Sequence, residues 1–192
     1  MNINIILSGV GGQGILSIAA VIGKAALKEN LYMKQAEVHG MSQRGGDVQS
    51  NLRLSDKPIS SDLIPLGQAD LIISLEPMES LRYLPYLKKE GYVVTNSEPF
   101  NNIKNYPEEA TLKAAYEKVP NKVVLDVTKV AKEVATARAA NIVLLGASVP
   151  FLGLTYEKIA EGIREIFSRK GEAVVNSNLA ALKSGYELAK KA

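Results

Sequence analysis

The feature that most constrains the fold of this chain is a glycine-rich turn between a short strand and a long helix. An apolar run of strand length, Ile3–Leu7, leads into Gly9-Val10-Gly11-Gly12-Gln13-Gly14, and from Ile15 apolar residues recur at helical spacing. Glycines allow a tight turn and a close approach of the backbone to a ligand, and a helix N-terminus presents free amides to an anion. We therefore expect a phosphate or carboxylate to bind at Gly11, Gly12, Gln13 and Gly14. The alternative is that the glycines only pack the helix against the strand.

The same turn satisfies the G-x-G-x-x-G pattern of dinucleotide-binding proteins, which requires a strand before it and a helix after it. Glu37 follows Gly14 by 23 residues, near the end of a second predicted strand, Tyr32–Val38, where a carboxylate could bind a ribose. One open interpretation is thus an independent NAD(P)-dependent oxidoreductase that uses Gly9, Gly11, Gly14 and Glu37. A binding subunit without catalytic residues is another.

Strands and helices alternate along the chain, which is the pattern of an α/β fold. Three short apolar runs predict central, parallel strands covered by helices on both faces: Leu71–Leu75, Val93–Thr95 and Val123–Val127. Helices are predicted between and after them at Pro77–Leu84, Glu108–Lys118 and Thr128–Ala137. The last third of the chain is predicted to be helical, although Ala140–Leu145 fits either type of element.

Two further patterns concern strands and their ends. Val48–Leu54 alternates apolar and polar residues, so we expect this strand to be half exposed. Polar residues follow the apolar strands and could line one crevice: Glu76, Asn96, Ser97 and Asp126. Helix capping is the commoner role of such residues, and we expect it above all for Asp126.

Composition excludes several classes of function. A length of 192 residues indicates a single domain that spans residues 1–192. Lys plus Arg exceed Asp plus Glu by only 23 − 20 = 3, so the net charge does not indicate nucleic-acid binding. The chain has no cysteine and one histidine, His39, which removes thiolate nucleophiles, cysteine-ligated clusters and multi-histidine metal sites. The longest nearly apolar run, Ile142–Leu154, is too short and too interrupted to span a membrane. We expect a cytoplasmic protein without a metal or a catalytic residue of its own.

A second glycine-rich segment follows the predicted strand at Tyr32–Val38. It places polar side chains at the end of a strand, which is where α/β proteins bind ligands: His39, Ser42, Gln43, Arg44 and Gly45. The guanidinium of Arg44 could hold a carboxylate or phosphate, and His39 could exchange a proton near neutral pH. We interpret the segment as a loop that contacts a partner or a substrate. An ordinary connection between two strands remains the alternative.

These two motifs, in this order, resemble the gamma domain of 2-oxoacid:ferredoxin oxidoreductases. The fuller segment Glu37-Val38-His39-Gly40-Met41-Ser42-Gln43-Arg44-Gly45-Gly46 is similar to the small, beta subunits of the indolepyruvate branch more than to those of the pyruvate branch. The resemblance continues over nearly the whole chain, at Ala69-Asp70, Asn96-Ser97, Asn141, Leu145-Gly146-Ala147, Asn178 and Gly185-Tyr186.

The resemblance implies a three-layer α/β/α sandwich with a mainly parallel, Rossmann-like sheet. It also implies one subunit of an enzyme that oxidatively decarboxylates an arylpyruvate such as indolepyruvate, forms the acyl-CoA and passes electrons to ferredoxin. In that family a large, alpha subunit carries thiamine diphosphate and the iron–sulfur clusters, and coenzyme A is a co-substrate. The isolated chain is then expected to be inactive and to form a homodimer through the face meant for its partner.

Overall fold

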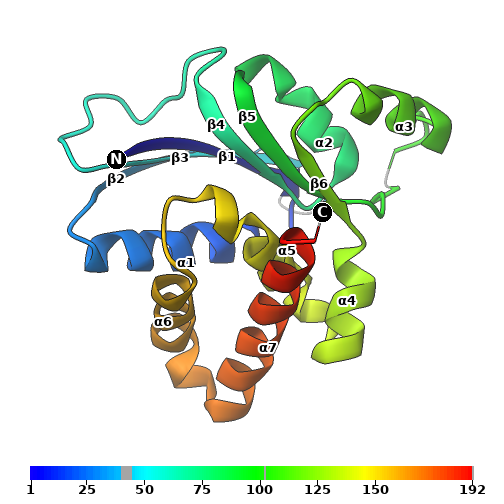
Figure 1. Cartoon of the computed structure of the whole chain (residues 1–192). Coiled ribbons are helices and arrows are strands. Elements are labelled where there is room, and N and C mark those ends of the chain that lie inside the picture. The colour runs from blue at the N-terminus through cyan, green and yellow to red at the C-terminus, as the bar shows by residue number, and fades with distance from the viewer. Residues whose placement is uncertain (40–44, 102, 192) are drawn as a thin grey trace.

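One mixed sheet runs through the molecule (Figure 1), which we describe from a computed structural model for residues 1–39, 45–101 and 103–191. Its six strands lie in the order β2-β3-β1-β4-β5-β6. The strands are β1 (Asn2–Val10), β2 (Tyr32–His39), β3 (Asp47–Ser55), β4 (Ala69–Ser74), β5 (Leu87–Asn96) and β6 (Lys122–Leu125). β1, β4, β5 and β6 are parallel, whereas the β2–β3 hairpin is added antiparallel beside β1. The mainly parallel sheet is therefore confirmed.

The helices also follow the predicted order. They are α1 (Ile15–Lys28), α2 (Pro77–Arg82), α3 (Glu109–Glu117), α4 (Val127–Val134), α5 (Ala140–Ser148), α6 (Tyr156–Phe167) and α7 (Glu172–Ala189). The ambiguous segment at Ala140–Leu145 is helical and belongs to α5. The helix predicted at Thr128–Ala137 ends at Val134, three residues early, because a separate 3-10 turn occupies Ala137–Ala139. None of the helices in the described residues is both long and apolar enough to cross a bilayer.

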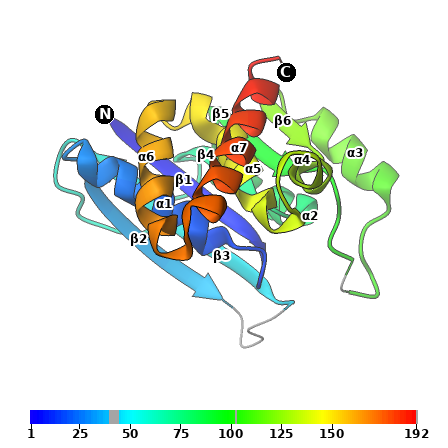
Figure 2. The ribbon, with the colours of Figure 1, turned by 90° about the horizontal axis from the view of Figure 1, so that it is seen from below.

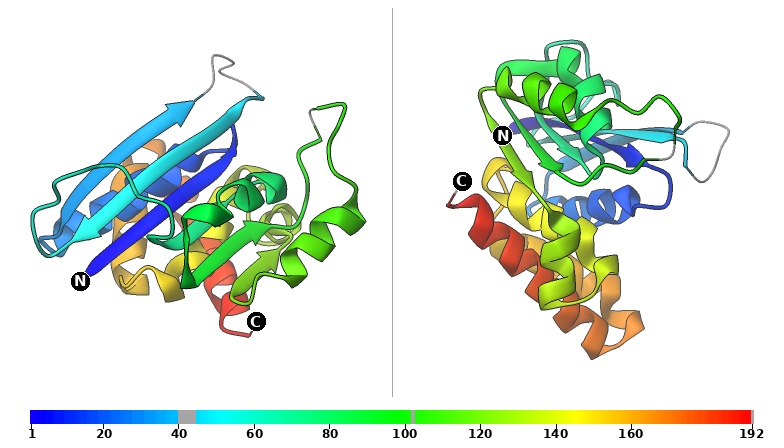
Figure 3. Two further views of the ribbon diagram at one scale, coloured as in Figure 1. Left: turned by 90° about the horizontal axis from the view of Figure 1, so that it is seen from above. Right: turned by 90° about the vertical axis from the view of Figure 1, so that its right-hand side faces the viewer.

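The helices form two unequal layers on the sheet. α1, α4, α5, α6 and α7 gather on one face, as the view from below shows (Figure 2), while α2 and α3 lie on the other (Figure 3). The main core joins Leu7 of β1 to Ile22 of α1 and Leu144 of α5, all fully buried. A smaller core under α2 and α3 contains Ile72 and Val93. The predicted α/β/α sandwich and its helical C-terminal third are confirmed.

The α2–α3 layer leaves the β2–β3 side of the sheet without a helix (left view of Figure 3). A loop over residues 56–68 covers part of it, and Arg53 fastens this loop by donating to the carbonyl oxygens of Ser61 and Leu63 at 2.9 and 3.2 Å. Asn51, on the polar face of β3, is only 3% exposed and accepts a hydrogen bond from the amide of Ile64. The prediction that this face of the strand is exposed was wrong at Asn51, because the loop that follows β3 covers it, whereas Gln49 and Arg53 remain partly exposed.

Strand β6 corrects a second prediction. The apolar run Val123–Val127 was expected to form a central strand, yet β6 is the edge of the sheet and Val124 is 38% exposed. The run is also divided, since Val127 already begins α4. An apolar run shows that a segment packs against the core, but it does not show how many neighbours the strand has.

The strand order bears directly on the dinucleotide interpretation. In dinucleotide-binding folds the second strand pairs in parallel with the first and delivers its acidic residue to the ribose. Here β3 lies between β1 and β2, and Glu37 sits on an antiparallel edge strand. The G-x-G-x-x-G turn is present without the strand arrangement that an NAD(P) site requires.

Helices α5 and α7 touch through their backbones at two glycines. A Cβ atom added to Gly146 would lie 2.1 Å from the carbonyl oxygen of Leu182, and one added to Gly185 would lie 1.9 Å from the carbonyl oxygen of Val143. No side chain fits at either position. This close crossing lies in the C-terminal halves of both helices and sets how closely α5 and α7 approach each other.

Candidate anion-binding cleft

A cleft of about 1190 Å³ lies at the carboxyl ends of the parallel strands β1, β4 and β5. Ligands of α/β proteins bind at this end of the sheet. Its walls come from the turn before α1, the ends of β4 and β5, the first residues of α4 and α5, the first half of α7, the end of α6 and the 3-10 turns Ala137–Ala139 and Ser168–Lys170. The lining residues are Gly12, Gln13, Gly14, Ser17, Leu75, Asn96, Val127, Thr128, Thr136, Ala137, Arg138, Ala139, Ala140, Asn141, Phe167, Lys170, Ala173, Val174, Ser177 and Asn178. The structure thus places three of the four predicted glycine-turn residues on one cleft.

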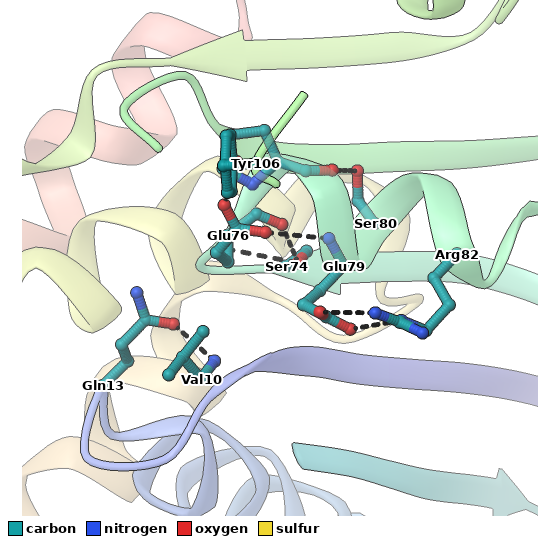
Figure 4. Close-up of polar contacts among 9 residues, drawn as sticks. Val10, Gln13, Ser74, Glu76, Glu79, Ser80, Arg82 and Tyr106 are labelled. Carbon is teal, nitrogen blue, oxygen red and sulfur yellow. Dashed lines mark hydrogen bonds and ion pairs between the residues drawn. The ribbon is translucent and has the colours of Figure 1, made fainter. Parts of the chain in front are cut away.

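The side chain of Gln13 holds the turn in shape. Its Oε1 accepts a hydrogen bond from the amide of Val10 at 2.8 Å (Figure 4), and its Nε2 donates to the carbonyl oxygen of Leu75 at 3.3 Å. Gly12 and Gly14 have φ of 100° and 90°, which side chains rarely adopt. The Gln13 side chain therefore stabilises the turn, while Gly12 and Gly14 line the cleft without a side chain.

Gly11 differs from its neighbours in the turn. Its amide donates to the carbonyl oxygen of Gly46 at 2.9 Å, and the residue does not line the cleft. The same contact brings the two predicted motifs together, because Gly46 belongs to the connection between β2 and β3. Of the predicted loop residues, His39 ends β2 opposite Val48, and Gly45 has φ 81°. Ser42, Gln43 and Arg44 lie outside the described residues.

The cleft has a positive electrostatic character. The N-termini of α1, α4, α5 and α7 all contribute lining residues, and each helix N-terminus carries a partial positive charge. The charged side chains that line the cleft are Arg138 and Lys170, and no Asp or Glu is among the described lining residues. Lys170 lies over the ring of Phe167, with its Nζ 5.4 Å from the ring centroid. This arrangement suits an anionic ligand.

Asn141, the second residue of α5, joins the cleft to the glycine turn. Its Nδ2 donates to the carbonyl oxygen of Gly14 at 3.1 Å. A Cβ on Gly14 would lie 2.7 Å from that Nδ2, so a glycine is needed there for steric reasons as well as for its φ. The side chain is 8% exposed, and its Oδ1 has no hydrogen-bond partner.

Two buried carboxylates lie beside the cleft and have structural roles (Figure 4). Glu76, 1% exposed, caps α2 by accepting from the amide of Glu79 at 2.9 Å, and it also accepts from the amide of Phe100 and the hydroxyl of Tyr106. It thereby anchors the connection that follows β5. Burial, together with the bond to Glu76, raises the pKa of Tyr106. The predicted capping by Asp126 is confirmed too, since it accepts from the amide of Lys129 at 2.8 Å.

Glu79 is 3% exposed and pairs with the guanidinium of Arg82, whose Nε lies 2.8 Å from its Oε2. Burial raises the pKa of Glu79, and the Arg82 pairing opposes this shift only in part. Burial also raises the pKa of the nearby Tyr83 to about 12. Neither Glu76 nor Glu79 lines the cleft, so both carboxylates belong to the framework around it.

Most of the cleft was not identified from the sequence, and the residues missed include Arg138, Asn141 and Lys170. These three residues lie more than a hundred residues from the glycine turn, and only the tertiary fold brings them to it. Asn141 was part of the resemblance, without an assigned role. No local signal marks Arg138 or Lys170, because each resembles an ordinary surface cation.

An α/β sandwich with an open, positively charged cleft at the carboxyl ends of its sheet defines the class of this protein. The chain belongs to the pyruvate ferredoxin/flavodoxin oxidoreductase family, whose model matches residues 4–188. It is a subunit of an oxidoreductase of this family, as its relatives are. It is 39% identical over 198 residues to indolepyruvate oxidoreductase subunit IorB of Pyrococcus horikoshii, covering 98% of this chain and 96% of that protein.

Other relatives are more distant. The pyruvate/ketoisovalerate oxidoreductases common subunit gamma of Pyrococcus furiosus is 29% identical over 93% of this chain and 92% of that protein. The crystal structure of a keto/oxoacid ferredoxin oxidoreductase gamma subunit from Geobacter sulfurreducens PCA matches with a TM-score of 0.72 at 26% identity, over 99% of both chains. A 2-oxoglutarate:ferredoxin oxidoreductase from Magnetococcus marinus, solved with 2-oxoglutarate, coenzyme A and succinyl-CoA bound, shares the fold with a TM-score of 0.79 at 22% identity. It matches all of this chain over 31% of its own. The resemblance in the sequence is confirmed.

Proposed function

We propose that this chain is the small subunit of an indolepyruvate-type, ferredoxin-dependent oxidoreductase. With a large alpha subunit it oxidatively decarboxylates an arylpyruvate to the acyl-CoA and transfers the electrons to ferredoxin. The observation that carries this proposal is the end-to-end similarity to the indolepyruvate subunit, at 39% identity against 29% for the pyruvate/ketoisovalerate subunit.

The redox cofactors of such an enzyme do not fit this chain. It has no cysteine to ligate an iron–sulfur cluster. The cleft offers no Asp or Glu among its described lining residues to hold the divalent cation that accompanies a diphosphate cofactor. We therefore assign thiamine diphosphate and the clusters to the large subunit.

We further propose that the cleft receives a phosphate group of coenzyme A. Helix N-termini and two cations surround it, and phosphate is the anion that helix N-termini bind most readily in proteins. The 2-oxoglutarate enzyme that shares this fold binds coenzyme A. In this proposal the chain binds and orients the co-substrate, while the chemistry takes place on the large subunit.

The substrate is tested by co-expressing the chain with its large subunit and assaying ferredoxin reduction. Indolepyruvate and phenylpyruvate should give a kcat/KM at least tenfold above those for pyruvate and 2-oxoglutarate. Equal or higher values for the aliphatic acids would overturn the arylpyruvate assignment.

The coenzyme A site is tested with charge variants of the assembled enzyme. Arg138→Ala and Lys170→Ala should each raise the KM for coenzyme A by about three- to tenfold, and the effect should shrink at high salt. Arg169→Ala is the matched control, because it removes a neighbouring exposed cation that does not line the cleft. The same KM change in all three variants would show only a general effect of net charge.

The segment from His39 to Gly45 is the proposed contact with the large subunit or its substrate. Its support is the hydrogen bond between Gly11 and Gly46, which places the end of this connection beside the glycine turn. Arg44→Ala should weaken assembly with the large subunit or raise the coenzyme A requirement. We also propose that the enzyme works in the cytoplasm, where cell fractionation should find its activity.

A further inference from the structure

Two buried side-chain atoms in the described part of the chain lack a hydrogen-bond partner, the Oγ of Ser8 and the Oδ1 of Asn141. A buried polar atom without a partner destabilises a protein by about 1–3 kcal/mol, so such atoms call for an explanation. Ser8 lies within β1 and is not among the described residues that line the proposed coenzyme A site, whereas Asn141 is. Only the second atom lies where a ligand could supply the missing bond.

The orientation of the Asn141 amide is fixed by its other end. Because Nδ2 donates to the carbonyl oxygen of Gly14, Oδ1 is the free end of the group. An amide oxygen can only accept hydrogen bonds. A fully ionised phosphate has no hydrogen to donate, so the anion attracted by the helix N-termini, Arg138 and Lys170 does not satisfy it. The atom instead requires a ligand that also carries an N–H or O–H donor.

We propose that Asn141 is a specificity-determining residue of the cleft, and that its Oδ1 accepts a hydrogen bond from an N–H or O–H donor of a phosphate-bearing ligand. The inference rests on the proposed function, and it adds which part of the ligand is recognised beyond its charge. Oδ1 is shielded from solvent in the unliganded chain, so the proposal requires the amide to rotate toward the cleft when the donor arrives, which lengthens the Nδ2 bond to Gly14.

Coenzyme A carries neutral donors on both of its halves: the amides and the hydroxyl of its pantetheine arm, and the amino group and the ribose hydroxyl of its adenosine. Either half provides the same chemistry, a neutral donor near a phosphate. Two fragments separate them: 4′-phosphopantetheine has the amides without adenine, and 3′-phosphoadenosine 5′-phosphate has the amino group without the amides. Inorganic pyrophosphate has the charge without either donor.

The test is isothermal titration calorimetry of the assembled enzyme with coenzyme A, the two fragments and pyrophosphate. Asn141→Leu should weaken the binding of coenzyme A about tenfold, as expected for one lost hydrogen bond. The same substitution should weaken the binding of one of the two fragments to a similar degree and should leave the affinity for pyrophosphate within twofold of wild type. The affected fragment identifies the half of coenzyme A that supplies the donor.

Ile142→Val is the control, because it thins the core at the adjacent residue of α5 without touching the cleft. It should leave all four affinities unchanged. Should Asn141→Leu not fold, Asn141→Ala makes the same comparison. Unchanged coenzyme A binding in the Asn141 variant, or an equal loss for pyrophosphate, would overturn the inference. If the wild-type enzyme itself fails to bind coenzyme A, the proposed site is wrong, and the wild-type titration alone shows it.

Discussion

Two glycines of the turn before α1 have similar left-handed backbones and different surroundings. A Cβ on Gly14 would collide with Asn141, whereas one on Gly12 would meet nothing within 4 Å. The space beside Gly12 opens into the cleft. Gly12 therefore allows a test of whether this space receives a ligand.

Gly12→Ala should lose about 1–2 kcal/mol of stability from backbone strain alone and should raise the KM for coenzyme A at least fivefold. Gly67→Ala is the control, since Gly67 also has a positive φ, 68°, with open space around it, and lies away from the cleft. It should show a similar loss of stability in urea unfolding and an unchanged KM. Parallel changes in both variants would favour a purely structural role for the turn.

Glu79 gives a prediction for the pH dependence of stability. Because burial raises its pKa in the folded state, its protonated form is favoured on folding, and its contribution to stability is lost as the pH rises through the folded pKa. Glu79→Gln lacks this dependence. The stability of the variant relative to wild type should therefore improve as the pH rises from about 4 to about 7.

The measurement is urea unfolding of both proteins at several pH values. Glu133→Gln, which removes an exposed carboxylate from α4, controls for net charge. A constant difference between Glu79→Gln and wild type across this range would contradict the assignment of a buried, destabilised carboxylate.

For individual residues, the sequence predicts those structural roles that depend on neighbours close in the chain. The glycine turn and the caps at Glu76 and Asp126 depend on neighbours within a few residues, and both were predicted. Asn141 and Lys170 depend on contacts over more than a hundred residues, and no pattern in the sequence places them beside Gly14. The part of the cleft formed by the glycine turn was therefore predictable from the sequence, and the parts formed by distant helices were not.

At the scale of elements, the crossing of α5 and α7 is the tightest contact between helices. Alanine normally stabilises a helix relative to glycine by about 0.5–1 kcal/mol. Gly185→Ala should do the opposite here, because the methyl group would overlap the carbonyl oxygen of Val143. Thermal unfolding should show a loss of roughly 1–3 kcal/mol or more.

Ala180→Gly, at an exposed position of the same helix, is the control and should cost only the usual helix propensity. A neutral or stabilising effect of Gly185→Ala would mean that the two helices can separate without cost. The close crossing would then not be what sets how closely α5 and α7 approach each other.

Hydrophobic periodicity predicts the type of most elements and little about their neighbours. It identified α1 and the strands β4 and β5, because apolar spacing reflects which residues face the core. It did not show that β3 separates β1 from β2, or that β6 is an edge. Strand order depends on long-range pairing, which leaves no period in the sequence.

At the scale of the whole molecule, the chain exposes large apolar side chains on two connections, Leu63 and Leu66 after β3 and Phe100 and Ile103 after β5. Exposed apolar groups of this kind often mark an interface. We predict that the isolated chain is colourless and inactive toward 2-oxoacids. We also predict that it forms a homodimer, and that adding the large subunit dissociates this homodimer and forms a complex of the two different subunits.

Light scattering with and without the large subunit measures this exchange. A strict monomer at high concentration would contradict the homodimer. Visible absorbance with stoichiometric iron in the pure chain would contradict the assignment of the clusters to the partner.

The meeting of four helix N-termini at one cleft has an evolutionary consequence. The partial positive charge of a helix N-terminus comes from its backbone and depends on no single side chain. A point substitution can therefore remove Arg138 or Lys170 but leaves the electric field of the helices in place. Relatives in this family are named for indolepyruvate and for pyruvate or ketoisovalerate. If the cleft binds coenzyme A as proposed, the helices would supply the same attraction for its phosphate whichever oxoacid the enzyme consumes.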